Sequence, residues 1–195
     1  MNYGELKTLV SDYLHRTDLD GKIPGFIDMA TQRIGRNLRS QENTTILEPF
    51  QPTTLDLALP ADYRGMKEIS YLVGVRRIQL RSANVDKMSA FAQSGELSQF
   101  YRINGLFVEI VPFSARDYRL IYYNAPVALV NDEDTNAILT AYPYLYVYGA
   151  MVEAMFYIRD FQAREGAVAT FTSEIDELNM MSSNADTGAQ MTMGG

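Results

Sequence analysis

Few side chains in this sequence have the type and spacing that catalysis needs. The chain contains no cysteine and a single histidine, His15. Without cysteine there is no thiol nucleophile, no zinc–thiolate site and no disulfide framework. One histidine leaves little general-base capacity near pH 7 and excludes a metal site built from histidines alone. The sequence therefore predicts a protein that is not an enzyme and that binds no metal or other cofactor.

Two acidic segments have features of cation-binding loops. Asp18–Gly21 suggests a calcium loop, but placing Gly21 at the required sixth position puts Arg16 first and Ile27 twelfth, where ligand oxygens are needed. The run Asn131–Asp134 contains three carboxylates, and contiguous carboxylates rarely converge on one ion. We interpret the first segment as a turn between helices. The second is expected to be a solvated loop whose carboxylates favour a helix N-terminus.

A pair of carboxylates is the remaining route to catalysis. Glycoside hydrolysis needs two carboxyl groups in a cleft, one of them with a raised pKa. Glu109, on an alternating segment, and Glu153, within an apolar helix, are the two acids to inspect for such a pair. The sequence has no glycine-rich phosphate loop, nucleophile elbow or HExxH motif. This alternative therefore requires a cleft around one of the two acids.

The composition is that of an ordinary soluble protein. A chain of 195 residues, 47% hydrophobic and 21% charged, can bury a core without disulfides or metals. Seventeen basic and 24 acidic residues give a net charge of −7, the wrong sign for an open nucleic-acid-binding surface. Charged residues interrupt Met1–Leu14, which excludes a signal peptide. The most apolar segment, Tyr144–Ile158, is too short to span a bilayer. We expect synthesis in a cytoplasm and no membrane partner.

Helical patterns occupy both ends of the chain. Asn2 begins a capping box for a first helix, and Pro24 can open a second. Further on, Asn136 can cap a short turn and Pro143 can open a long helix. Gly166 is expected to interrupt the helical pattern. The expected long helices cover about 2–16, 24–40, 143–162 and 168–178.

Alternating patterns occupy the middle. The clearest is Asn104-Gly105 between two alternating runs. This pair is preferred in two-residue hairpin turns because both positions need positive φ. A brief surface helix is expected over 84–93. The expected strands cover residues 53–59, 67–72, 75–80, 101–103, 106–111 and 118–124.

These patterns predict an α+β fold. A helical bundle is built from N- and C-terminal helices, with an inserted antiparallel β region and an extended C-terminal arm. The helical hairpin covers residues 1–43 and the β region 44–130. The C-terminal helices that complete the bundle cover 131–182, and the arm covers 183–195.

Three groups of side chains are candidates for a protein interface. Three arginines spaced by three residues share a helix face that meets solvent, an acidic protein partner, phosphate or nucleic acid: Arg33, Arg36 and Arg39. A helix that is apolar on nearly all sides must be covered on nearly all sides, by the core or by a neighbouring subunit. Its interface candidates are Tyr144, Tyr148, Met151 and Met155. In the arm, two adaptable methionines are suited to a partner's pocket: Met191 and Met193.

The order and spacing of several short segments resemble those of the head-to-tail adaptor proteins of tailed bacteriophages. The similarity covers about residues 3–165 and departs from the family pattern at Ala137–Leu139, where relatives often carry an aromatic residue. The matching segments are Tyr13–Arg16, Ile23–Ile27, Asn37–Arg39, Leu59–Tyr63, Phe100–Gly105, Tyr122–Pro126 and Tyr142–Tyr146.

The resemblance implies a structural role at the head-to-tail junction of the virion. Such adaptors form a homo-oligomeric ring, commonly of twelve copies, beneath the portal protein. The ring extends the channel through which double-stranded DNA passes and carries the tail tube or nozzle. In relatives the C-terminal segment reaches the portal. The alternatives are a cell-wall hydrolase carried in the tail, with Glu109 or Glu153 in a cleft, and another ring of the tail stack, such as a nozzle or stopper.

Overall fold

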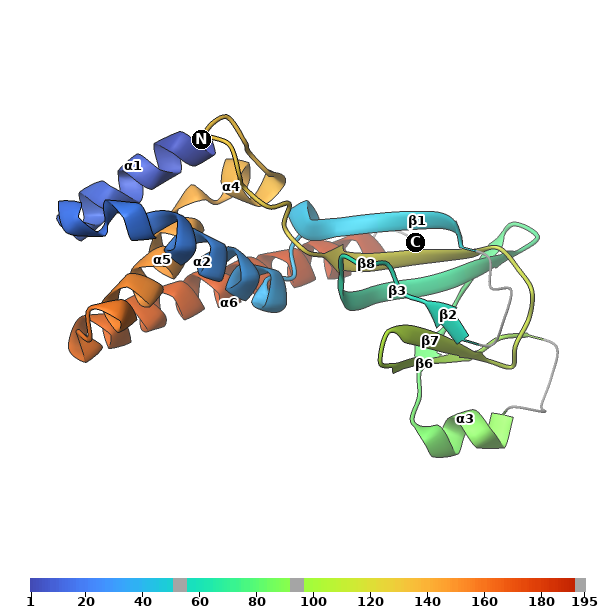
Figure 1. The fold of residues 1–195 in the computed structure, drawn as a ribbon. Coiled ribbons are helices and arrows are strands. Elements are labelled where there is room, and N and C mark those ends of the chain that lie inside the picture. The colour runs from blue at the N-terminus through green and yellow to red at the C-terminus, as the bar shows by residue number, and fades with distance from the viewer. Residues whose placement is uncertain (51–55, 92–96, 192–195) are drawn as a thin grey trace. The chain divides into compact units, whose positions relative to one another are not determined.

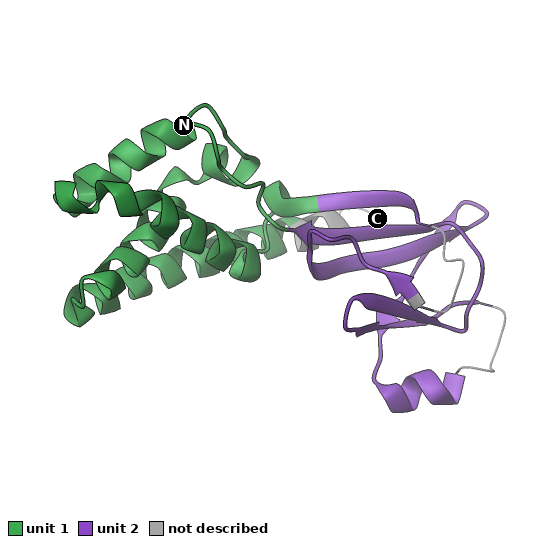
Figure 2. Ribbon diagram, viewed as in Figure 1, with its two compact units in different colours: residues 1–44, 125–195 green, residues 45–124 purple. Residues whose placement is uncertain are grey.

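The chain folds into two compact units (Figure 2). The computed structural model describes residues 1–50, 56–91 and 97–191. The helical unit combines Met1–Thr44 with Ala125–Gly195, and the β unit is the continuous segment Thr45–Asn124. Among the described residues, the hydrophobic cores of the two units have no side chain in common. The chain is therefore an α+β protein in which a β segment is inserted into a helical bundle.

Three helices form the body of the helical unit (Figure 1). Helix α5 (Pro143–Tyr157) packs against both α2 (Ile23–Asn37) and α6 (Phe161–Met191). The three helices approach closely at Gly149, where an added Cβ would lie 2.8 Å from Ala30 Cβ and 3.1 Å from a Phe171 ring carbon. Three further elements complete the unit: α1 (Tyr3–Leu14), the 3₁₀ turn Thr17–Lys22 and α4 (Ala137–Ala141).

The first turn of α1 is capped by the acidic loop that follows the β unit. The predicted capping box is confirmed: the Glu5 N–H donates to Asn2 Oδ1, and the Asn2 N–H donates to Glu5 Oε2, both at 2.9 Å. The next two free N–H groups, of Tyr3 and Gly4, donate to the carbonyls of Asp134 (2.8 Å) and Asp132 (2.9 Å). All four N-terminal donors of this helix end are thus satisfied or capped. The acidic loop therefore contacts α1 through two backbone carbonyls and through the Asp132 carboxylate, which accepts from Lys7 Nζ at 2.5 Å.

The β unit contains two four-stranded sheets. The first has the order β1 (Thr44–Phe50), β8 (Tyr118–Asn124), β3 (Tyr63–Val73) and β4 (Arg76–Gln79). The second has the order β2 (Asp56–Ala58), β7 (Phe107–Val111), β6 (Phe100–Asn104) and β5 (Arg81–Ser82). Helix α3 (Val85–Phe91) follows β5. The β3–β4, β3–β8, β2–β7 and β6–β7 pairs are antiparallel, and the two-residue β5–β6 pair is parallel.

Both hairpins of the β unit turn on a glycine followed by an aliphatic residue. Asn104 pairs with Phe107, so the two turn residues are Gly105 and Leu106, one position later than the predicted Asn104-Gly105. Only Gly105 has positive φ (61°) in this turn, which fits a turn with glycine at its first position. The β3–β4 hairpin repeats this arrangement at Gly74 (φ 61°). The hairpin was predicted correctly, but its turn was placed one residue early.

The C-terminal helices differ from the expected ones. The break lies at Arg159, which has a φ of 62°, and Gly166 lies inside α6 instead of interrupting the helix. The Asp160 carboxylate caps the new helix by accepting the Ala163 N–H at 3.0 Å. Residues 183–191, expected in an extended arm, continue α6, and the rest of that arm lies outside the described residues. Of the predicted strand 53–59, residues 56–59 are described, and β2 covers Asp56–Ala58 of them.

Candidate functional site

Arg33, a predicted interface residue, forms an ion pair with Glu153 of α5. Its Nε donates to Glu153 Oε1 at 3.1 Å, and its Nη2 donates to the same oxygen. The Glu153 side chain is only 11% exposed, so the pair is largely shielded from water. Removing one partner of such a pair would leave a poorly solvated charge. The pair therefore fixes α2 against α5, and the Glu153 carboxylate is already committed to a cation.

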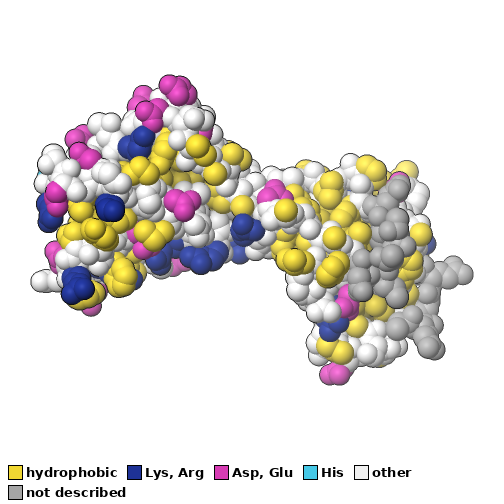
Figure 3. Space-filling model, viewed as in Figure 1, with side chains coloured by type: hydrophobic (Ala, Val, Ile, Leu, Met, Phe, Trp, Pro, Cys, Tyr) yellow, Lys and Arg dark blue, Asp and Glu magenta, His cyan; other side chains and the backbone are white. Residues whose placement is uncertain are grey.

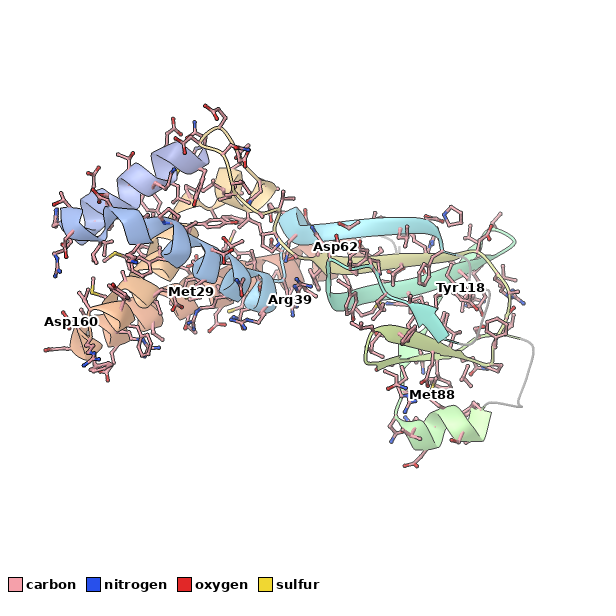
Figure 4. The ribbon with its side chains drawn as sticks, viewed as in Figure 1. Met29, Arg39, Asp62, Met88, Tyr118 and Asp160 are labelled. Carbon is pink, nitrogen blue, oxygen red and sulfur yellow. The ribbon has the colours of Figure 1, made fainter. Side chains whose placement is uncertain are left out.

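The other two arginines do not share a helix face. Arg36 is exposed on α2, whereas Arg39 lies beyond the end of that helix at Asn37 and is half-buried (Figure 4). Arg39 Nη1 donates to the Leu38 carbonyl at 2.8 Å. The prediction of one arginine face from 33 to 39 is therefore wrong, because the helix ends before its last member.

Asn179 fastens α6 to the end of α2, a contact that the sequence analysis missed. Its Oδ1 accepts the Arg39 backbone N–H at 2.6 Å, and its Nδ2 donates to the Asn37 carbonyl at 3.1 Å. These two backbone groups lie where α2 can no longer supply partners. Asparagine is a poor residue for a helix interior, and its place on the inward side of α6 was the available signal.

The aromatic helix α5 divides its predicted interface residues between the surface and the core. Tyr144 is 50% exposed and stacks on the half-buried Tyr148, with ring centroids 6.4 Å apart. Met151 and Met155 are partly buried against the helical core. Of the arm methionines, Met191 is the last residue of α6, and Met193 lies outside the described residues.

An apolar groove lies where α5 ends and α6 begins. We call it the corner groove, of about 520 Å³; its exposed lining includes Met29, Phe156, Tyr157, Arg159 and Phe161. Hydrophobic side chains gather beside Lys and Arg side chains at this end of the helical unit, where Figure 4 labels Met29 and Asp160 (Figures 3 and 4). Exposed apolar clusters of this kind mark sites of protein contact. The sequence analysis included none of these five residues among its interface candidates, because their clustering depends on the turn at Arg159.

The environment of Glu109 is the opposite of what the hydrolase alternative requires. Arg102 Nη2 donates to both Glu109 carboxylate oxygens (2.7 and 2.6 Å), and Asn104 Nδ2 donates to Oε1 at 2.8 Å. These contacts, led by the Arg102 hydrogen bonds, lower the pKa of Glu109. A general acid needs a raised pKa. Within the described ranges, no three His, Asp or Glu side chains lie close enough together to hold a metal ion.

The comparisons with known proteins agree with a structural role in a phage particle. The family model for the SU10 adaptor protein matches residues 1–194, which cover both units. The match defines the class of the chain as a bacteriophage structural protein and a component of the virion. The chain belongs to the SU10 adaptor protein family, a family of phage head-to-tail adaptors. No curated protein matches it significantly. No helix of the described residues is long and apolar enough to cross a bilayer.

Proposed function

We propose that the chain assembles into a ring of twelve copies between the portal and the tail of the phage. There it extends the DNA channel and provides the platform for tail attachment. The observation that carries this proposal is the family match over residues 1–194, because it includes the helical unit, the β unit and α6 together. The location at the head-to-tail junction follows from that role, with synthesis in the host bacterial cytoplasm.

The helical unit supports the proposal with exposed aromatic surface. Tyr144, Phe156, Tyr157 and Phe161 are each at least half exposed. Tyrosine and phenylalanine are enriched where protein subunits meet. The neighbouring copies, the portal and the tail tube or nozzle are the partners that would cover this surface. We retain as interface residues Arg33, Arg36, Arg39, Tyr144, Tyr148, Met151, Met155, Met191 and Met193.

The net charge of −7 supports a role in which DNA passes through without binding. An acidic bore repels the phosphate backbone, so that double-stranded DNA can slide past it without sequence-specific contacts. The role is structural and not catalytic. The committed carboxylates of Glu109 and Glu153 support this part of the proposal.

Light scattering tests this function. The purified chain should bind portal rings of its own phage at about one copy per portal subunit. A variant lacking Met180–Gly195 keeps Asn179 and the packed part of α6, and it should lose portal binding while its helical content per residue stays normal. A chain that ignores the portal would contradict the proposal. Binding to tails but not to portals would indicate another ring of the tail stack.

A further inference from the structure

The corner groove is apolar, and the charged side chains beside it differ in whether they have a bonding partner. Four of its side chains are 42–58% exposed: Met29, Phe156, Tyr157 and Phe161. The Glu153 carboxylate at its edge is paired with Arg33, and the Asp160 carboxylate beside it caps α6. Arg159 is exposed and, among the described residues, has no ion-pair partner. The groove therefore combines an aromatic surface with the Arg159 cation, which has no carboxylate partner among the described residues.

A second exposed surface lies farther along α6 and has the complementary character. Asp176, Glu177, Met180 and Met181 follow the spacing i, i+1, i+4, i+5, which places them along one side of a helix. All four are exposed, and the two methionine side chains are 66% and 61% exposed. The opposite side of α6 carries the buried Phe171 and Ile175. We call the exposed set the acid–methionine stripe.

The two surfaces cannot cover each other within one chain. Both belong to the helical unit, and α6 connects them: Phe161 is its first residue, and Met180 lies nineteen positions later. At about 1.5 Å per residue, the helix separates these positions by about 28 Å. Different patches at separate positions along one helix suit a head-to-tail contact between copies.

We propose that the corner groove of one copy receives the acid–methionine stripe of the next copy around the ring. Methionine side chains adapt to irregular apolar surfaces and make favourable contacts with aromatic rings, here those of Phe156 and Phe161. Arg159 meets the carboxylates of Asp176 and Glu177, which are also without an ion-pair partner among the described residues. The inference rests on the proposed ring and names the surfaces that join its subunits.

Site-specific cross-linking tests this contact, because the chain has no native cysteine. The variant F161C/M180C, assembled on portal rings and treated with a short bis-maleimide, should give a ladder of covalent oligomers. A mixture of the two single variants should stop at dimers, and each single variant alone should give none. The matched control is Y13C/M180C, since Tyr13 is an exposed aromatic of the helical unit outside the groove. Y157C replaces F161C if the latter fails to assemble.

A charge exchange provides the second measurement. Arg159→Glu and Glu177→Arg should each lower the assembled fraction severalfold, because each places like charges in contact. The combined variant should recover assembly. Three results would overturn the interface while leaving the ring intact: assembled rings without a ladder, cross-linking of Met180→Cys to itself, or cross-linking only to portal or tail protein. Failure of the wild-type chain to assemble on portals would contradict the proposed function as well as this contact.

Discussion

The helical unit and the β unit differ sharply in charge. The helical unit carries eight basic and sixteen acidic residues, a net charge of −8, whereas the β unit carries nine basic and eight acidic residues, a net charge of +1. The acidic excess of the chain therefore belongs entirely to the unit formed by its two ends. Electrostatic self-repulsion between copies would fall mainly on the helical units. The complementary groove and stripe lie on the same unit, where attraction must overcome that repulsion.

The units also differ in how their segments are held together. The helical unit joins distant parts of the chain through side-chain contacts to helix ends, such as those of Asn179 with the backbone of Asn37 and Arg39. The β unit is one continuous segment with an internal polar network. In it Tyr71 Oη donates to the Ser98 carbonyl (2.9 Å), and Ser98 Oγ lies 2.7 Å from Tyr118 Oη. The β unit can thus be inserted between α2 and α4 without supplying side chains to the helical core.

The largest expected effect tests whether the two units are stable independently of each other, and it comes from opening a cavity in one of the two cores. Leu120 in the β unit and Leu139 in the helical unit are both fully buried. Leu120→Ala should lower the unfolding free energy of the β unit by about 2–5 kcal/mol while the helical transition at 222 nm stays unchanged. Leu139→Ala should lower the unfolding free energy of the helical unit by a similar amount and leave that of the β unit unchanged. Equal shifts of a single transition by both variants would show that the two units unfold as one.

Alkaline unfolding should reveal the buried Tyr146 of the helical unit. Burial raises the pKa of Tyr146 from 10.0 to about 12, although its hydrogen bond with Asn136 acts in the lowering direction. Because the folded pKa lies above the unfolded one, this stabilisation is complete below pH 10 and is lost as the pH rises towards 12. The loss amounts to about 3 kcal/mol. Denaturant titrations of wild type and Tyr146→Phe between pH 8 and 12 measure it, and parallel pH profiles would contradict it.

Two glycines of the helical unit provide a matched pair. At Gly149 a new Cβ would lie 2.8 Å from Ala30 Cβ and 3.1 Å from a Phe171 ring carbon, whereas at Gly166 it would meet nothing within 4 Å. Gly149→Ala should cost about 1–3 kcal/mol through overpacking. Gly166→Ala should stabilise α6 by about 0.5–1 kcal/mol. Thermal unfolding followed at 222 nm checks both signs, and a stabilising Gly149→Ala would show that α2 and α5 can separate freely.

The smallest effect is expected at the Glu109–Arg102 pair of the β unit. These side chains are 21% and 28% exposed, so Glu109→Gln should cost about 0.5–1 kcal/mol. Since Arg102 lowers the pKa of Glu109 in the folded chain, this contribution is present at neutral pH and is lost as the pH falls through the folded pKa. Urea titrations at neutral and acid pH check this dependence. A cost that persists unchanged at acid pH would assign the effect to packing.

Local signals predicted the elements that depend on neighbouring residues. The Asn2 capping box, the Asn136 cap, the opening of α5 at Pro143 and strand β8 over 118–124 lie where the sequence analysis placed them. Each depends on side chains within a few positions of the element itself. Strand β1, in contrast, was not predicted individually, since its pairing with β8 joins residues at least 68 positions apart.

The surfaces available for contact were harder to predict. The sequence indicated an over-hydrophobic α5, but the partner of Arg33 is Glu153, 120 positions away, and no local pattern identifies it. The corner groove depends on a left-handed Arg159, a conformation that non-glycine residues adopt rarely. Gly166 was the better candidate for a break by propensity. The Asp160 cap instead starts α6 earlier, and the continuing helix tolerates that glycine.

Native mass spectrometry of connector complexes released from phage particles tests the central claim most directly. A head-to-tail ring predicts a complex in which portal and this chain occur together in a fixed ratio, with twelve copies of the chain. Particles that lack the chain, or that carry it in a single copy or only in complexes without portal, would contradict the assignment of this protein as the ring beneath the portal.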